Sequence, residues 1–449
     1  MLEIPRSGLD PLDLYAALSV RGRALLLESG DGVGYSHVAS IVEPAVSWSI
    51  GDGGDPFQWL RELVAGDAVA VPWCPGFAGG YVGAFSYDLV RAIEQLPSIA
   101  ADDLPVPTIE LYRVERFYTV DHAAEVVRAV ISVALDDRPL DQQHAEVREQ
   151  LEGMIELLGG IVPSAVVRRS PSDDPLDGVE STLEQHAFES RVERALEYIR
   201  AGDIFQVNLS MRLSCPFNGG ALDLYRELRR INPSPWMALL PFNERTVVSA
   251  SPELLVRVQD RVVETRPIAG TRKRGATSAE DERMREELRS DPKERAEHLM
   301  MVDLERNDIG RVAHYGTVCV SEFMTLEPYS HVTHIVSHVR GELADERDAI
   351  DAVRALFPGG TITGAPKVRS MEIIDELEPT RRGLYTGSIG WLGFDGAAEL
   401  NIAIRTITIR GGRAYVQVGA GIVADSIPER EYRESLRKAR ASLEALQWR

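Results

Sequence analysis

The sequence predicts an α+β fold, and three observations carry that prediction. Strand-like and helix-like stretches occur on both sides of one long polar segment. They do not follow the regular strand–helix–strand alternation that builds a parallel sheet. No GxGxxG or P-loop motif follows a strand-like stretch, so a nucleotide-binding sheet has no support.

The composition is that of an ordinary soluble globular protein. Of the 449 residues, 44% are hydrophobic and 26% are charged, which suits one large or two medium domains. The formal net charge of −20 argues against a phosphate backbone as partner, so we expect no nucleic-acid binding. No apolar run could span a bilayer and the first residues lack a signal-peptide pattern, so we expect no membrane contact and a cytoplasmic location. Cys74, Cys215 and Cys319 lie far apart, which disfavours disulfides and thiolate metal sites.

Three regions follow one another along the chain. The N-terminal region, residues 1–162, contains short strand-like runs such as 23–29 and 114–122, with helical patches between them. Residues 163–186 are rich in Pro, Ser and Asp and poor in large apolar residues, which predicts a linker or exposed loop. Residues 187–449 form the remaining region.

The elements after the linker show clearer patterns. Apolar residues recurring every three to four positions predict a helix over 186–203, and a strand-like run follows over 204–214. Residues 245–272 predict several strands. A further helix is predicted to begin after Asp291, a suitable N-cap, with Pro292 at its first position.

The stretch "FPGGTITGAPK", residues 357–367, concentrates three glycines, two threonines and two prolines between two apolar, helix-like stretches. Glycine tolerates dihedrals that other residues avoid, and it lets a ligand approach the backbone closely. A tight connection between two helices explains the loop equally well. The loop alone leaves both interpretations open.

Glutamates recur on one face of two predicted helices. Glu294 and Glu297 lie three apart, and Glu431, Glu434 and Lys438 lie at i, i+3 and i+7 near the C-terminus. Each group alone is typical of a solvated helix face. If the two faces met, they would form a ring of hard oxygen ligands that suits Mg²⁺ and an anionic substrate.

Isolated polar residues complete the set of candidates. Glu253, His334 and Arg405 each lie in an apolar, strand-like context, and Gly419 and Gly421 flank one alanine. Together an acid, a histidine, an arginine and a glycine-lined backbone could bind a small dicarboxylate beside a metal. Taken singly, a core histidine and an ion-paired arginine are the commoner explanations.

Several motifs in order resemble the chorismate-utilising enzymes. This family includes the large subunits of anthranilate synthase and aminodeoxychorismate synthase, with isochorismate and salicylate synthases as cousins. The resemblance is strong over residues 190–449 and weaker in the N-terminal region, where "LLLES" and "GGYVGAFSYDLVR" carry it. The strong motifs are "DIFQVNLS", "SASPELL", "RPIAGTRKRG", "KERAEHLMMVDLERNDIGRV", "FPGGTITGAPKVRSMEIIDELEPTRRG" and "VGAGIVADSIPEREY".

The resemblance implies a fold of two large antiparallel β-sheets packed as a sandwich with surrounding helices. It makes residues 187–449 the chorismate-binding catalytic domain. The glycine-threonine loop would line the chorismate pocket, with Thr361, Thr363 and Gly364 against the substrate. The four glutamates Glu294, Glu297, Glu431 and Glu434 would surround Mg²⁺, which holds the ring carboxylate.

The resemblance also implies roles for the remaining candidates. Glu253 would be the general acid on the departing C4 hydroxyl, since a hydroxyl leaves poorly unless it is protonated. His334 would lie beside the reacting ring. The groups holding the enolpyruvyl carboxylate would be Tyr385, Arg405 and the amides of Gly419, Ala420 and Gly421, with Lys438 close by. The catalytic set also includes Gln206 and Thr271, and the substrate-binding set includes Ala269 and Gly270.

Position 206 bears on the nucleophile. Family members that add water carry a lysine base where this chain has Gln206. A neutral amide cannot deprotonate water, whereas ammonia is already a competent nucleophile. None of the three cysteines lies in a glycine-flanked nucleophile elbow. Ammonia would therefore come from solution or from a separate glutamine amidotransferase subunit.

Position 269 bears on the product. One type of aminodeoxychorismate synthase has a lysine nucleophile where this chain has Ala269, and alanine is usual in anthranilate synthases. The motifs "QVNLS", "TITGAPK", "RRGLYTGSIGW" and "ELNIAIRT" are more similar to an aminodeoxychorismate synthase large subunit, including a Bacillus-like type with alanine here. We expect 4-amino-4-deoxychorismate for para-aminobenzoate and folate synthesis, with anthranilate for tryptophan synthesis as the alternative. Without the lysine, another group must attack C2 of chorismate.

A tryptophan site is the last candidate. The motif ending at Ser29 and the segment "NPSPWM" resemble tryptophan-binding elements of relatives; its candidates are Asn232, Pro233, Ser234, Pro235 and Met237. Bound tryptophan would be an inhibitor or a structural ligand. A purely regulatory, amino-acid-binding role is the remote alternative, because every catalytic position holds the expected residue type.

Overall fold

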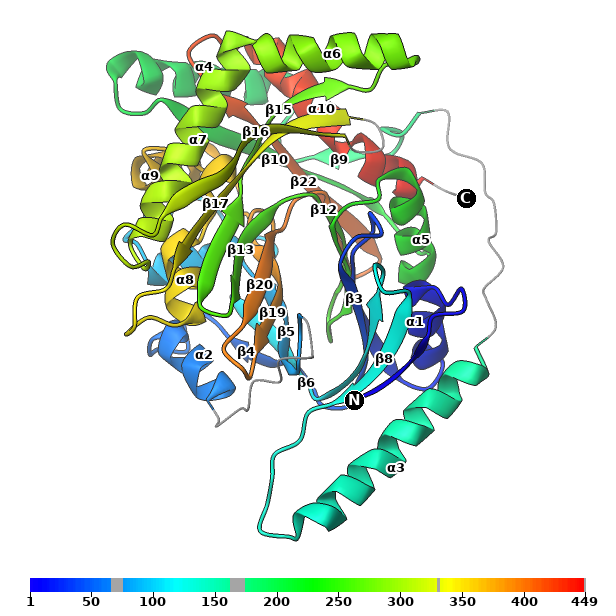
Figure 1. Cartoon of the computed structure of the whole chain (residues 1–449). Coiled ribbons are helices and arrows are strands. Elements are labelled where there is room, and N and C mark those ends of the chain that lie inside the picture. The colour runs from blue at the N-terminus through cyan, green and yellow to red at the C-terminus, as the bar shows by residue number, and fades with distance from the viewer. Residues whose placement is uncertain (66–75, 162–173, 329–331, 448–449) are drawn as a thin grey trace.

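The computed structural model describes residues 1–65, 76–161, 174–328 and 332–447. In these residues two large antiparallel sheets form the body of the molecule, and helices surround them (Figure 1). This architecture confirms the predicted α+β fold with two sheets.

The first sheet has the strand order β1-β8-β7-β3-β2-β11-β12-β21-β22-β10-β18, and β9 pairs with β10. Its strands are β1 (Leu2–Pro5), β2 (Arg23–Glu28), β3 (Tyr35–Ile41), β7 (Arg116–Asp121), β8 (Val126–Ile131), β9 (Glu180–Ser181), β10 (Gln206–Pro216), β11 (Trp236–Pro241), β12 (Thr246–Ser251), β18 (Gly364–Ala365), β21 (Thr406–Arg410) and β22 (Arg413–Ile422).

The second sheet has the order β15-β17-β14-β13-β20-β19-β5-β6-β4, and β16 pairs with β17. Its strands are β4 (Val46–Trp48), β5 (Gly80–Phe85), β6 (Ile109–Val114), β13 (Leu254–Gln259), β14 (Val262–Arg266), β15 (Ile268–Lys273), β16 (Cys319–Pro328), β17 (Val332–Glu342), β19 (Ser388–Gly393) and β20 (Ala398–Ile402).

The helices connect the strands and cover the sheets. They are α1 (Pro11–Ser19), α2 (Pro56–Val64), η1 (Tyr87–Ala92), α3 (Leu140–Gly159), α4 (Gln185–Ala201), α5 (Ala221–Ile231), α6 (Ser278–Ser290), α7 (Pro292–Gly310), α8 (Ala349–Leu356), η2 (Gly360–Ile362), α9 (Lys367–Leu377) and α10 (Pro428–Leu446). Helix α7 begins as predicted: Asp291 accepts hydrogen bonds from the N–H groups of Lys293 and Glu294, and Pro292 occupies the first turn.

Successive side chains of β10 point to opposite faces of the first sheet, and the two faces differ in polarity. Val207, Leu209 and Met211 belong to the core that also contains residues of α4, α5 and α10. Asn208 and Ser210 lie between them and therefore point to the opposite side of the sheet. A polar row on β10 thus faces away from the helices that cover this sheet.

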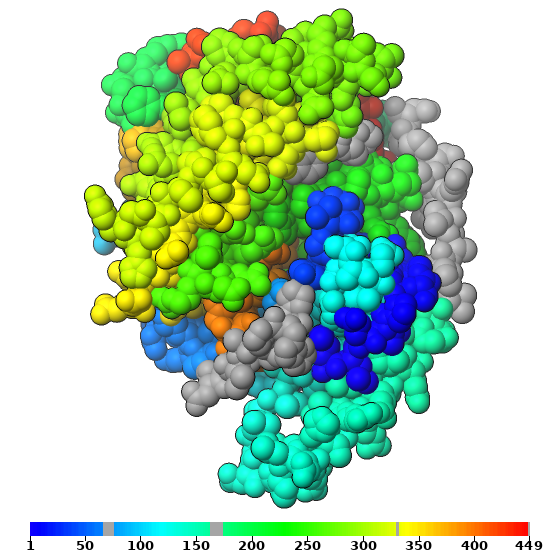
Figure 2. Space-filling model, viewed as in Figure 1, coloured from blue at the N-terminus to red at the C-terminus, as the bar shows by residue number. Residues whose placement is uncertain are grey.

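Both sheets take strands from the N-terminal and the C-terminal regions of the chain. Strand β2 pairs with β11 in the first sheet, and β5 pairs with β19 in the second. One core cluster draws residues from both sheets, including Leu25, Phe117, Leu240 and Trp391. Figure 2 shows the blue and cyan N-terminal segments packed against the green later chain.

Several other expectations concern the predicted linker, the cysteines and membrane contact. Residues 163–173 of the predicted linker, and Cys74, lie outside the described residues. In the described remainder of that segment β9 is a short two-residue strand. Cys215 and Cys319 are free thiols. No helix in the described part of the chain is long and apolar enough to cross a membrane.

Candidate active site

Glu253 and the glycine-threonine loop form the centre of the site. Glu253 follows β12 and is only 5% exposed. Thr361 Oγ1, in η2, donates a hydrogen bond to Glu253 Oε1 at 2.8 Å, and the N–H of Ile268 donates to the same oxygen at 3.3 Å. Burial raises the pKa of Glu253 to about 7, although these bonds and the charges of Arg405 and Lys438 lower it. Glu253 can therefore carry a proton near neutral pH.

Hydrogen bonds to residues of α7 and β10 fix the conformation of the glycine-threonine loop. The N–H of Gly360 donates to Glu305 Oε1 at 3.2 Å, and the N–H of Asn208 donates to the carbonyl of Thr363 at 2.9 Å. The Thr363 hydroxyl donates to the carbonyl of Gly359 at 2.9 Å. Thr363 therefore holds the loop, whereas the Thr361 hydroxyl faces the acid.

Two glycines allow close packing around Gln206, at the start of β10. Gly364 has a φ of +137°, and a Cβ there would lie 2.1 Å from the carbonyl oxygen of Gln206. A Cβ at Gly421 would lie 2.9 Å from Gln206 Nε2. The Oε1 atom of Gln206 and the Oδ1 atom of Asn208 are both buried, and neither has a hydrogen-bond partner among the described residues.

His334 and Thr271 are cross-strand neighbours on β17 and β15. Thr271 Oγ1 and His334 Nδ1 lie 2.9 Å apart, and the Gly270 carbonyl lies 3.3 Å from the same nitrogen. Burial, together with the charges of Arg405 and Lys438, lowers the pKa of His334 to about 3. The imidazole is therefore neutral near neutral pH.

The predicted carboxylate-binding groups come from β22, α10 and two turns. Gly419, Ala420 and Gly421 pair with β10, and the side chain of Ala420 is buried in the core. Lys438 Nζ donates to the Gly419 carbonyl at 3.1 Å. Arg405 has a φ of +51° and donates to Asn232 Oδ1 at 3.4 Å.

Tyr385 lies in the segment before β19, and Ala269 lies in β15. Burial raises the pKa of Tyr385 to about 12. Its ring lies under Arg382, whose guanidinium carbon is 5.5 Å from the ring centroid. Ala269 is a partly buried residue of β15 opposite Ile335.

The four predicted metal ligands on α7 and α10 lie near enough to one another for their charges to interact. Burial raises the pKa of Glu297, and the negative charges of Glu294, Glu431 and Glu434 raise it further. Gly270, with a φ of +64°, packs against this group, because a Cβ there would lie 3.0 Å from Glu294 Oε2. Two helices far apart in sequence thus present like charges to one another.

These carboxylates fit a divalent cation by their chemistry, although basic residues hold three of them. Arg272 binds Glu294 at 2.8 Å, Lys293 lies 3.8 Å from Glu297, and Lys438 lies 3.1 Å from Glu434. In the described residues no three His, Cys, Asp or Glu side chains converge on a formed metal site. Mg²⁺ needs only one or two carboxylates beside substrate oxygens and waters, and it would relieve the repulsion.

The residues of the predicted tryptophan site also lie together. The N–H of Gly30, next to Ser29, donates to the carbonyl of Ser234 at 2.9 Å. Met237 pairs with Glu28 across β11 and β2. The other members, Asn232, Pro233 and Pro235, lie in the segment between α5 and β11.

Sequence reasoning missed Arg382, which connects the glycine-threonine loop to β10 through hydrogen bonds. This buried arginine donates to the carbonyl of Ile362 at 2.9 Å and to that of Asn208 at 2.6 Å, and it pairs with Glu378 at 2.7 Å. The sequence offered only the "RRG" motif as an indication of its importance. That motif contains two adjacent arginines, Arg381 and Arg382, and does not show which of them is buried in the site.

Comparison with known proteins agrees with this arrangement. The family described as chorismate binding enzyme matches residues 23–444. The chain belongs to this family. It is a chorismate-utilising enzyme, which confirms the resemblance, whereas the individual residue roles stay predictions.

Individual relatives are similar over most of the chain. Aminodeoxychorismate synthase component 1 of Bacillus subtilis (strain 168) is 48% identical over 401 residues, 88% of this chain and 83% of the relative. Anthranilate synthase component 1 of Thermus thermophilus is 47% identical over 393 residues, 88% of this chain and 83% of the relative. The crystal structure of anthranilate synthase component I from Streptococcus pneumoniae TIGR4 superposes with a TM-score of 0.80 at 36% identity and covers 92% of each chain.

Proposed function

We propose that the chain aminates chorismate to 4-amino-4-deoxychorismate with Mg²⁺, using ammonia from a partner glutaminase subunit in the cytoplasm. The reaction converts chorismate and ammonia into the product and water, and it would supply para-aminobenzoate for folate. Support comes from the 48% identity to aminodeoxychorismate synthase component 1, a name that itself points to a second component.

The observation that carries ammonia as nucleophile is the pair of buried amide oxygens on β10. Gln206 Oε1 and Asn208 Oδ1 are acceptors without donors, and they lie on the same side of the strand. Buried acceptors are costly when left unpaired, and ammonia has three N–H donors. Neither amide can take a proton from water, so the pair favours ammonia over water as nucleophile.

The remaining site residues would act as the general acid, as neighbours of the ring and as binding groups for the carboxylates. Glu253, held by Thr361, gives its proton to the C4 hydroxyl, which leaves as water. Neutral His334 lies beside the ring without adding charge. Arg405 and the Gly419–Gly421 backbone hold the enolpyruvyl carboxylate. Bound Mg²⁺ would be held by the glutamates of α7 and α10 and would stabilise the charge of the ring carboxylate.

Anthranilate formation is the second candidate, and Ala269 favours it. Alanine at this position provides no amine for a covalent adduct at C2. The Thermus thermophilus anthranilate synthase component 1 is 47% identical, almost as similar as the first relative. Both reactions begin with the same substrate, nucleophile and acid, so the site residues serve either.

Product analysis separates the two candidates. The chain is incubated with chorismate, Mg²⁺ and ammonium salt, and the products are resolved by chromatography. We expect a product that releases para-aminobenzoate only after an aminodeoxychorismate lyase is added. Fluorescent anthranilate without lyase would establish the second candidate. Glutamine in place of ammonium should give no turnover until the partner subunit is added.

A further inference from the structure

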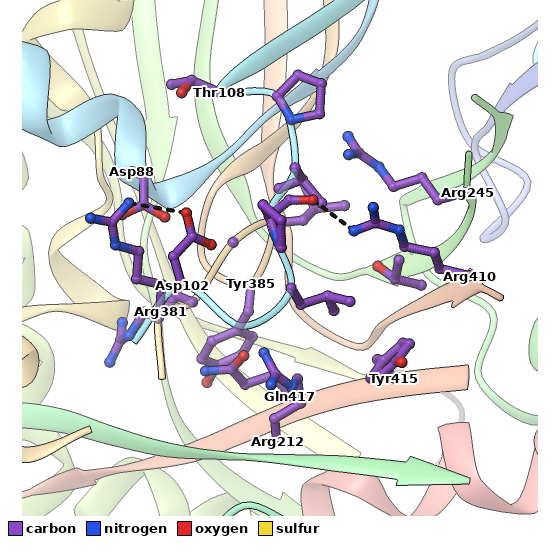
Figure 3. Close-up of a pocket in the computed structure, with 18 of the residues that line it drawn as sticks. Asp88, Asp102, Thr108, Arg212, Arg245, Arg381, Tyr385, Arg410, Tyr415 and Gln417 are labelled. Atoms are coloured by element: carbon purple, nitrogen blue, oxygen red, sulfur yellow. Dashed lines mark hydrogen bonds and ion pairs between the residues drawn. The ribbon is translucent and has the colours of Figure 1, made fainter. Parts of the chain in front are cut away.

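A cavity of about 630 Å³ lies beside the predicted chorismate site (Figure 3). Its walls come from strands β10, β21 and β22, from the segment 104–108 and from the turn 381–385. Small-molecule sites in proteins occupy roughly 300–1,000 Å³. Glu253, His334 and the four glutamates are not among its lining residues, whereas Tyr385 of the predicted substrate-binding set is, so the cavity adjoins the predicted reaction centre and shares one wall residue with it.

One end of the cavity concentrates positive charge. Thr246 and Ile409 are paired on β12 and β21, which places Arg245 next to Arg410, and Figure 3 shows both side chains at the same side of the cavity. Burial lowers the pKa of Arg245 and the positive charge of Arg410 lowers it further, while the negative charge of Glu110 opposes both effects. Two guanidinium groups that repel each other form a natural place for an anion.

The existing partners leave these arginines incompletely satisfied. Arg245 pairs with Glu110 at 2.8 Å, yet its Nε is buried without an acceptor among the described residues. Arg410 donates to the carbonyl of Pro105 at 2.7 Å and pairs with Glu244 at 3.1 Å. Glu244 is 79% exposed, so water screens that pair. An additional carboxylate would supply the missing acceptor.

Part of the remaining cavity wall is apolar or aromatic, and two charged residues in that wall already have partners: Arg381 pairs with Asp102 and Arg382 with Glu378. Leu104, Val106 and Leu384 face the cavity, and Tyr415 and Tyr385 lie at its base in Figure 3. A bare inorganic anion would leave this surface uncovered. A flat apolar body that carries one carboxylate matches both parts of the wall.

We propose that this cavity is a second ligand site, which binds a small aromatic carboxylate with its carboxylate group at Arg245 and Arg410. The site is connected to the glycine-threonine loop through Arg382, which lines the cavity and donates hydrogen bonds to the carbonyls of Ile362 and Asn208. Occupancy therefore changes the affinity for chorismate, and chorismate changes the affinity for the carboxylate by the same factor. This coupling rests on the proposed function, whereas the binding itself does not.

Isothermal titration calorimetry on the full chain tests the binding. The probe is 4-aminobenzoate, and 4-aminobenzamide is its neutral counterpart of the same shape. We expect the amide to bind at least about tenfold more weakly, since a charge-assisted hydrogen bond contributes more than a neutral one. Equal affinity for the two probes would overturn the proposal.

Variants of Arg410 and of a control arginine test whether 4-aminobenzoate binds in this cavity. Arg410→Gln should weaken 4-aminobenzoate binding about tenfold, and Arg410→Lys, which keeps the charge, should lose less. Arg413→Gln is the control. Arg413 belongs to the same β21–β22 hairpin as Arg410, and its side chain is similarly exposed, 31% against 27%. Arg413 pairs with Glu180, and neither residue lines the cavity. Circular dichroism melting verifies the folding of each variant. Equal weakening by Arg410→Gln and Arg413→Gln would overturn the site.

Chorismate distinguishes the second site from the first. With chorismate saturating and ammonium absent, 4-aminobenzoate should still bind, with a shifted dissociation constant. Complete loss of binding would mean that both ligands share one site, and the proposal would fall. An unshifted dissociation constant would remove the coupling and leave the site. Because no turnover is measured, failure of the proposed amination would leave these results standing.

Discussion

Glu253 shows how single residues of this chain acquire unusual chemistry. The side chain is buried, and its two hydrogen bonds from Thr361 and Ile268 reach the same oxygen, Oε1. Burial outweighs these bonds, so the pKa rises to about 7. A carboxyl group with this pKa can give up a proton at the pH of the cell.

Replacing Glu253 with Gln should lower turnover by about 10²-fold or more, because the amide keeps the shape but has no acidic proton. The Michaelis constant for chorismate should change little. Steady-state kinetics at saturating ammonium and Mg²⁺ measure both quantities. If only the Michaelis constant rose, Glu253 would be a binding group and another residue would be the acid.

The same substitution should increase stability at alkaline pH. The folded state holds this proton up to about pH 7, whereas the unfolded chain loses it near the ordinary glutamate pKa of 4.5. Stability therefore falls as the pH rises through this window, by about 3 kcal/mol at about 1.4 kcal/mol per pKa unit. Urea unfolding of Glu253→Gln and wild type at pH 5 and pH 8 should show the variant gaining relative stability at pH 8. The exposed Glu149→Gln should show no such gain, and an equal gain in this control would contradict the assignment.

Gln206→Lys should lower ammonia-dependent turnover. The substitution removes the unpaired Oε1 acceptor, and a lysine cation beside Gly421 would repel ammonium. A neutral lysine could take a proton from water, so some isochorismate formation is the accompanying expectation. Chorismate consumption with and without ammonium, with products resolved, measures both effects. Undiminished amination would show that residue 206 does not face the nucleophile.

At the scale of elements, the predicted metal site requires both helix α7 and helix α10. Each helix carries two of the glutamates. Burial raises the pKa of Glu297, and the charges of the other three carboxylates raise it further. Neither helix alone provides more than a solvated acidic face.

Glu297→Gln should abolish Mg²⁺-dependent turnover and leave the fold intact, because one ligand charge is lost with little change in shape. Turnover is measured against Mg²⁺ concentration, and circular dichroism verifies folding. Asp303→Asn, on the same helix and 76% exposed in its side chain, is the control and should behave like wild type. Unaltered turnover of Glu297→Gln at saturating Mg²⁺ would remove this residue from the metal shell.

Elements with local signals were predictable from the sequence, and contacts between distant elements were not. The start of α7 follows from Asp291 and Pro292 alone, because capping acts within one turn. The approach of α7 to α10 depends on the packing of whole sheets, so spacing could only suggest it. Arg382 escaped prediction for a related reason: its hydrogen bonds to the carbonyls of Ile362 and Asn208 join segments far apart in the chain.

At the scale of the whole molecule, the two sheets join the beginning and the end of the chain. Strands β2 and β5 from the N-terminal region continue the sheets that β11 and β19 begin in the C-terminal region. The core between the sheets contains Leu25 and Phe117 from one region and Leu240 and Trp391 from the other. The site residues, by contrast, lie at positions 206 to 438. The N-terminal region therefore supports the site without contributing predicted catalytic groups to it.

A fragment of residues 187–449 should fail to fold cooperatively, although it contains all predicted catalytic residues. Without the N-terminal strands, the edges of β11 and β19 would be exposed. The C-terminal half of the shared core would also lose its packing partners. Circular dichroism melting and size-exclusion chromatography should show a broad transition and aggregation for the fragment, and one sharp transition for the full chain. Co-expression with residues 1–162 should restore the soluble, folded form by supplying the missing strands. A monomeric fragment with a sharp transition and ammonium-dependent chorismate turnover would show instead that residues 187–449 are an independent catalytic domain.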